Sequence, residues 1–160
     1  MTRVAFDTNV LVYAELEPGT EKGALGGSLI ERASIEQGII AAQVVGEFLA
    51  VVRRKRRELF PTACEFALEL TSLFKIGETD TTVMRNAIEL AQRHRLQFWD
   101  AVICAASLKA GATHLLSEDI HDGFTVAGPT IAGLTIVNPF AEANRSLVDR
   151  LLPPLPTASS

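Results

Sequence analysis

Short apolar stretches alternate with longer helical segments along most of this chain, and this alternation restricts its fold more than any other feature. Stretches with branched or aromatic apolar side chains occur at residues 3–6, 39–42, 75–77, 114–116 and 134–137, and we expect them to be strands. Segments with apolar residues three or four positions apart separate most of them. The pattern predicts an α/β fold with a short central parallel sheet and three α/β/α layers.

Capping and turn-forming residues set the expected helix limits. Asp100 is expected to open a helix that is apolar almost all round, and Gly111 to end it. Residues 123–133, with Gly128 and Pro129, are expected to form a loop before the last strand. The expected helices cover residues 10–15, about 20–37, 43–57, the segment from Pro61, 80–95 and 100–110.

The chain has 160 residues, the size of one domain. We expect residues 1–140 to form this domain, and residues 141–160 to form a tail that is partly helical and then disordered. No apolar run is long enough to span a membrane, and the first residues lack the pattern of a secretory signal, so we expect a cytoplasmic protein. Cys64 and Cys104 are expected to be free thiols.

The formal net charge of −4 argues against a protein that coats nucleic acid through a broad basic surface. An acidic site that holds divalent cations still presents positive charge locally, so nucleic acid stays a candidate substrate. The one strong basic run is Arg53 to Arg57. We interpret it as a solvated helix end that complements the helix dipole, and contact with an RNA backbone or an acidic partner segment is the alternative.

Two acidic residues follow predicted strands directly. Asp7 comes after the first strand, and Asp119 comes shortly after the strand at 114–116. Ligands of an open α/β sheet bind beyond the carboxyl ends of its strands. These two side chains are therefore expected at the ligand-binding edge of the sheet.

Two further acidic residues lie among apolar neighbours. Glu47 has Val44 and Phe48 on the same helix face, and Asp100 has Ile103. A carboxylate in such a place costs free energy unless it is paired or bound to a metal. Carboxylates that meet without a cation would raise each other's pKa. Mg²⁺ or Mn²⁺ suits a site with oxygen ligands only, and its natural chemistry there is phosphodiester hydrolysis.

Each acidic residue also has a purely structural explanation. Asp7 and Asp100 are each placed to cap a helix. Asp119 is placed to be an ordinary loop carboxylate, and Glu47 to pair with a buried arginine. Asp7, Asp119 and also Glu47, which lies early in the helix after the strand at 39–42, are expected at one sheet edge. Four separate structural roles are therefore harder to accept than one shared site.

The four segments resemble the PIN-domain family, which includes the toxin nucleases of bacterial VapBC toxin-antitoxin pairs. Residues 4–13 (VAFDTNVLVY) resemble the opening strand and first acidic position of that family, and 45–48 (VGEF) resemble the second. Residues 98–101 (FWDA) resemble the third, and 116–119 (LSED) the fourth. The resemblance spans residues 1 to about 140, and four motifs in the family's order are a strong signal.

This resemblance implies a Mg²⁺- or Mn²⁺-dependent ribonuclease, with RNA as substrate, that forms a homodimer. In the toxin branch it also implies a VapC-type toxin that a cognate antitoxin neutralises. Asp122 is implied as a residue that assists or replaces Asp119. The implied metal ligands are Asp7, Glu47, Asp100 and Asp119, and the implied supporting catalytic residues are Asn9 and Ser117.

Three competing functions are weighed against this one. An aspartyl-phosphate phosphatase also has an Asp after its first strand but needs a second acid two residues on, where this chain has Asn9. A receiver-type phosphorylation switch needs an acidic pair and a suitably placed lysine, and we find neither. The remaining alternative is a catalytically weak PIN-like module that binds RNA or protein outside a toxin-antitoxin pair. The intact acidic positions count against it.

Overall fold

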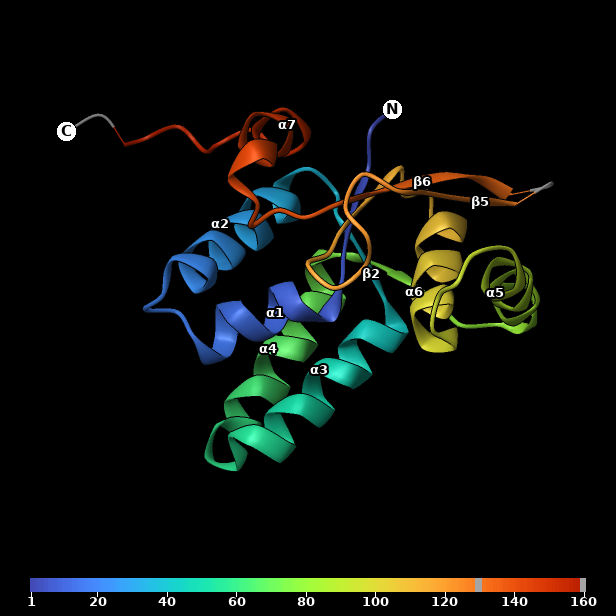
Figure 1. Ribbon diagram of the computed structural model, residues 1–160. Coiled ribbons are helices and arrows are strands. Elements are labelled where there is room, and N and C mark those ends of the chain that lie inside the picture. Colours follow the sequence, from blue (N-terminus) through green and yellow to red (C-terminus); the bar gives the residue numbers. More distant parts are fainter. Residues whose placement is uncertain (129–130, 159–160) are drawn as a thin grey trace.

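The computed structural model describes residues 1–128 and 131–158, which form a six-stranded sheet between two layers of helices (Figure 1). The strand order is β3-β2-β1-β4-β6-β5, and only β5 runs antiparallel to its neighbour among these strands. The expected three-layer α/β fold is therefore confirmed. The strands are β1 (Val4–Phe6), β2 (Ile39–Ala41), β3 (Lys75–Gly77), β4 (His114–Leu116), β5 (Thr125–Gly128) and β6 (Ile131–Val137).

The helices form three crossovers between parallel strands. The first, α1 (Thr8–Leu16) and α2 (Glu21–Ile35), leads to β2, and the second, α3 (Ala42–Lys55), a short 3₁₀ helix η1 (Arg57–Leu59) and α4 (Phe60–Leu73), leads to β3. The third, α5 (Thr81–Arg93) and α6 (Phe98–Lys109), returns across the sheet to β4. Because crossovers are right-handed, this reversal puts α5 and α6 on the face opposite to the other helices. Accordingly, α6 packs on β2, β3 and β6.

The inner strands are buried on both faces, as their continuous apolar sequences predict. Every residue of β1 and β2 is buried. Seven successive residues of α6, from Ala101 to Ser107, are also buried, which agrees with a helix that is apolar all round. In the described part of the chain, no helix is both long and apolar enough to cross a membrane.

The loop expected over residues 123–133 is wrong, because the described residues 125–128 and 131–133 belong to two antiparallel strands. β5 pairs antiparallel with β6, and β6 begins at Ile131 instead of Leu134. Glycine and proline mark hairpin turns as well as loops, so this sequence did not distinguish the two. Pro129, which we placed in the loop, lies outside the described residues.

The C-terminal segment packs back on α2. It contains a short 3₁₀ helix η2 (Glu142–Asn144) and α7 (Arg145–Leu151), which lies over α2 (Figure 1). Arg32 of α2 donates hydrogen bonds to the Asp149 carboxylate at 2.9 Å and to the backbone carbonyl of Leu152 at 3.2 Å. Residues 152–158 form no helix or strand, and Ser159 and Ser160 lie outside the described residues. The domain limit at residue 140 and the disorder of the chain end stay predictions.

Candidate active site

The candidate site lies where the chain reverses direction across the sheet. β1 pairs in parallel with β2 on one side and with β4 on the other, and the crevice at such a switch point is the usual ligand site of an open α/β sheet. Asp7 follows β1, and Ser117 follows β4. The Asp7 N–H donates to the Leu116 carbonyl at 2.9 Å, so the pairing of the two strands brings these side chains together.

Asp7 is the buried centre of the site, with only 4% of its surface exposed. Its Oδ1 accepts from the Thr8 N–H at 2.8 Å, which caps α1, and its Oδ2 accepts from the Ser117 hydroxyl at 2.7 Å. The pKa of Asp7 is raised from 3.8 to about 6: burial raises it most, the two hydrogen bonds lower it, and the negative charges of Asp100 and Asp119 also raise it. Asp7 does cap α1, as its structural explanation requires. A helix cap alone, however, requires neither the burial of Asp7 nor its acidic neighbours.

Asn9 and Ser117 connect the first and the fourth acidic positions. The Asn9 amide donates to the Asp119 carboxylate at 3.2 Å and reaches the Asp7 carboxylate at 3.5 Å. The Ser117 hydroxyl, which donates to Asp7, also accepts from the backbone N–H groups of Asp119 and Ile120, each at 3.2 Å. These contacts orient the start of the loop after β4 against Asp7.

Glu47 lies half-buried on α3 and is held by neutral donors. The Thr8 hydroxyl donates to Oε2 at 2.9 Å, and the Gln43 amide donates to Oε1 at 3.0 Å. The alternative of a buried arginine partner is therefore wrong. Thr8 and Gln43 are partners of Glu47 that the sequence did not predict, although Thr8 stands inside the first acidic motif.

Asp100 lies half-buried in the first turn of α6 and does not cap it. The helix begins two residues earlier than expected, at Phe98, after Gln97, whose side chain makes no capping hydrogen bond. The cap explanation of Asp100 is therefore wrong. Burial raises the pKa of Asp100, and the negative charges of Glu47 and Asp119 raise it further.

The four acidic side chains share one electrostatic environment without converging on a point. Among the described residues, no lysine, arginine or histidine forms an ion pair with any of them. Within residues 1–128 and 131–158, no three acidic, histidine or cysteine side chains stand close enough together to ligate one ion as placed. The atoms that these four side chains offer to a metal ion are all carboxylate oxygens, which Mg²⁺ and Mn²⁺ prefer as ligands. Their uncompensated negative charge fits a cation, since an opposite charge lowers the raised pKa values.

Asp122 has a different role from the one that the resemblance implied. Its carboxylate accepts from the Asn138 N–H at 2.8 Å and from the Asn144 side-chain amide at 2.9 and 3.0 Å. These bonds tie the loop after β4 to the C-terminal segment. Because the carboxylate is engaged there, the geometry does not support Asp122 as a replacement for Asp119.

An open groove of about 560 Å³ begins at the acidic residues and extends along α1 and α3. Glu47 and Asp119 lie in its acidic part, and Arg54 and Lys55 line it near the end of α3. The groove therefore joins the candidate site to the basic run. Its other lining residues are Thr8, Asn9, Val12, Tyr13, Glu17, Ala50 and Val51.

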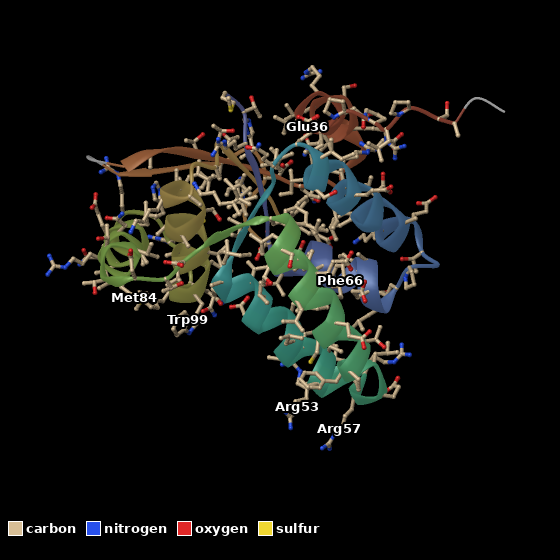
Figure 2. The ribbon with its side chains drawn as sticks, turned by 180° about the vertical axis from the view of Figure 1, so that it is seen from behind. Glu36, Arg53, Arg57, Phe66, Met84 and Trp99 are labelled. Carbon is tan, nitrogen blue, oxygen red and sulfur yellow. The ribbon has the colours of Figure 1, made fainter. Side chains whose placement is uncertain are left out.

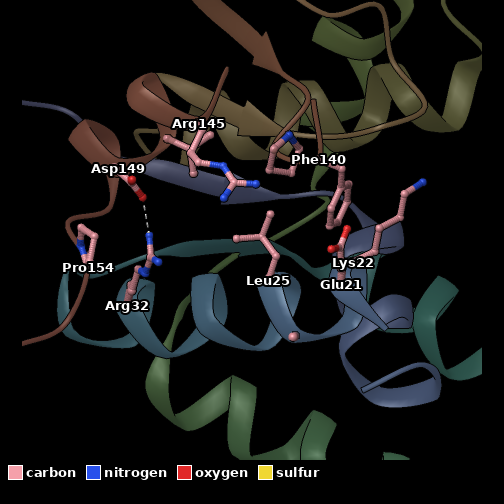
Figure 3. A pocket seen from close by; sticks show the side chains of 11 residues that line it. Glu21, Lys22, Leu25, Arg32, Phe140, Arg145, Asp149 and Pro154 are labelled. Atoms are coloured by element: carbon pink, nitrogen blue, oxygen red, sulfur yellow. Dashed lines mark hydrogen bonds and ion pairs between the residues drawn. The ribbon is translucent and has the colours of Figure 1, made fainter. Parts of the chain in front are cut away.

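A second cavity, of about 470 Å³, lies between α2 and the C-terminal segment (Figure 3). Figure 3 shows Arg32 reaching Asp149 at one end of this cavity, with Leu25 and Phe140 toward the other. None of the six candidate residues lines it. The groove and the cavity are therefore different features, and it is the groove that three of the candidate residues, Asn9, Glu47 and Asp119, line.

The fold is that of a PIN domain. The sequence matches the PIN domain family over residues 4–124, a span that covers most of the chain and includes all six candidate residues. The chain belongs to the PIN-domain family.

Solved structures with a similar fold include three from toxin-antitoxin systems. VapBC2 from Rickettsia felis, bound to a promoter DNA fragment, has 17% identity and a TM-score of 0.61, over 86% of this chain and 98% of that one. A toxin-antitoxin complex from Klebsiella pneumoniae has 21% identity and a TM-score of 0.58, over 86% and 98%. VapC20 from Mycobacterium tuberculosis, a toxin that cleaves the sarcin-ricin loop, has 17% identity and a TM-score of 0.56, over 72% and 89%. At these identities the likeness shows the fold alone. Among curated proteins, none matches the chain.

Proposed function

We propose that this protein is a divalent-metal-dependent ribonuclease that hydrolyses RNA phosphodiester bonds at the acidic crevice. Membership of the PIN-domain family supports nuclease chemistry. The observation that carries the proposal is the buried Asp7, with a pKa of about 6 and two acidic neighbours that raise it. A carboxylate in this environment gains most from a bound cation.

In this proposal Asp7, Glu47, Asp100 and Asp119 hold Mg²⁺ or Mn²⁺. When bound, such an ion lowers the pKa of its water and stabilises charge on the scissile phosphate. Asn9 and Ser117 act as positioning residues, because they orient the carboxylates of Asp7 and Asp119.

Cleavage by matched variants tests the chemistry. The purified protein is expected to cut RNA with Mg²⁺ or Mn²⁺ and to stop with EDTA. Glu47→Gln should lower the rate by at least the roughly 10- to 100-fold that loss of an outer-shell metal contact costs. Glu36→Gln is the matched control, because Glu36 is exposed at the end of α2, away from Trp99 beside the site (Figure 2). Equal rates for the two variants would contradict the proposal.

Metal binding has its own readout in Trp99, the single tryptophan of the chain. This side chain is 53% exposed and precedes Asp100. Mn²⁺ is expected to quench its fluorescence in the wild-type protein and to do so much more weakly in Asp100→Asn. Cleavage that persists in EDTA would refute metal dependence. RNA binding without cleavage would favour the catalytically weak binding module.

We further propose that the nuclease is a VapC-type toxin, a homodimer that a cognate antitoxin inhibits. The support is the likeness of its fold to proteins solved in toxin-antitoxin complexes. Induced expression should arrest bacterial growth, Glu47→Gln should not, and co-expression of a small neighbouring gene should restore growth. An active ribonuclease without any effect on growth would contradict the toxin role alone. Sedimentation equilibrium should give twice the chain mass.

A further inference from the structure

The basic run Arg53 to Arg57 at the end of α3 is divided between the groove and the rest of the surface. Arg54 and Lys55 line the groove that also holds Glu47 and Asp119. Both cations are exposed, and among the described residues neither forms an ion pair. Their charges are therefore available to a ligand in the groove.

The other residues of the run have different surroundings. Arg53 lies over the Phe60 ring, with its guanidinium carbon 5.3 Å from the ring centre, a cation–π contact. Arg56 pairs with Glu58 at 2.6 Å. Figure 2 shows Arg53 and Arg57 at the tip of the α3–α4 hairpin, and neither lines the groove. The interpretation of a solvated helix end suits these residues, but not the pair in the groove.

The spacing along α3 suits a nucleic-acid strand. Glu47 and Arg54 are seven residues apart, which is two helical turns or about 10 Å along one helix face. This distance corresponds to roughly three nucleotides of a stacked single strand. Tyr13 of α1 lines the same groove, and its hydroxyl donates to Glu118 at 3.1 Å. Its ring is already engaged by Phe140 and Lys22, so the two cations of α3 are the groups in the groove that carry the inference.

We infer that Arg54 and Lys55 bind the phosphates of a single-stranded RNA segment about three nucleotides from the bond to be cut. The inference rests on the proposed function and adds the path of the substrate. Continuity favours RNA over an acidic peptide, because the groove that holds the two cations also holds Glu47 and Asp119. A strand whose scissile phosphate lies at these acids passes the cations as it leaves.

Binding to a fluorescein-labelled 12-nucleotide oligouridylate tests the inference without cleavage. The parent protein carries Asp100→Asn, which leaves the groove lining intact. Adding Arg54→Ala and Lys55→Ala should make the negative slope of log K against log salt shallower by about 1.4. The affinity for the oligouridylate at 0.1 M salt should fall about 25-fold. The matched control, Arg56→Ala with Arg57→Ala, removes the same charge outside the groove and should keep the parent slope. Far-UV circular dichroism should show that all three proteins are folded.

Kinetics of the active protein provide a second readout. The Arg54→Ala, Lys55→Ala pair should raise KM for long RNA and leave kcat unchanged, while cleavage of a dinucleotide too short to reach the pair should be unaffected. An unchanged RNA affinity, or an equal loss in the control pair, would overturn the inference and assign the cations to another partner, such as an acidic peptide. The proposed nuclease would still stand in that case, since the wild type would still cut RNA. A protein that neither binds nor cuts RNA would refute both.

Discussion

Replacement of Asp7 by asparagine is expected to stabilise the metal-free protein at neutral pH, although it removes a residue that we place at the centre of the active site. Burial raises the pKa of Asp7 from 3.8 to about 6, which corresponds to about 3 kcal/mol. Because the pKa is higher in the folded than in the unfolded protein, protonated Asp7 contributes this amount to the unfolding free energy. The contribution is fully present below pH 3.8 and is lost as the pH rises through 6. Above that pH the wild-type protein holds an ionised carboxylate at a cost.

Asparagine avoids this cost and keeps the helix cap, since Asn and Asp cap about equally well. The pKa of about 6 already includes the hydrogen bonds from Ser117 and Thr8 to the ionised carboxylate, so no further subtraction is made for them. The gain in unfolding free energy at pH 8 should therefore be about 3 kcal/mol, and most of it should be lost near pH 4. Urea denaturation in EDTA at pH 4, 6 and 8 measures it.

Asp80 provides the matched control, because it also caps a helix. Its side chain accepts from the Val83 N–H at 2.9 Å, and a hydrogen bond from Lys109 lowers its pKa. Asp80→Asn should therefore destabilise the protein at neutral pH, the opposite sign. Mg²⁺ should stabilise the wild type and have much less effect on Asp7→Asn. A variant at Asp7 that is less stable than the wild type at pH 8, or a difference that does not change with pH, would refute the reasoning.

Four further substitutions test other residues of the structure. Gly77→Ala places a Cβ 2.8 Å from a backbone oxygen of α6 and should cost about 1–3 kcal/mol in urea denaturation. Gly46→Ala, in open space on α3, should instead add about 0.5–1 kcal/mol. Ser117→Ala removes a hydrogen bond that lowers the pKa of Asp7, so the acidic limb of the cleavage pH profile should move to higher pH. Arg32→Ala should speed amide hydrogen exchange in α7, and unchanged exchange would contradict the anchoring role of this arginine.

Much of the fold could be predicted from the sequence because its signals are local. An apolar stretch of three or four residues between helical segments indicates a strand, and each of the five stretches that we identified contains a strand or part of one. The rule that ligands bind at the carboxyl ends of strands then placed Asp7 and Asp119 at one edge. The hairpin of β5 and β6 was missed, because its residues carry turn signals instead of a strand pattern.

The sequence by itself determined the order of strands and helices and the candidate acidic positions, because backbone preferences and hydrophobic periodicity act over a few residues. Tertiary packing alone decided which side chains meet. It brought Thr8 against Glu47 from 39 residues away, directed Arg54 and Lys55 into the groove, and left Asp122 tied to the C-terminal segment. These outcomes depend on how helices pack across the sheet, and contacts between distant residues leave no periodic trace in a single sequence.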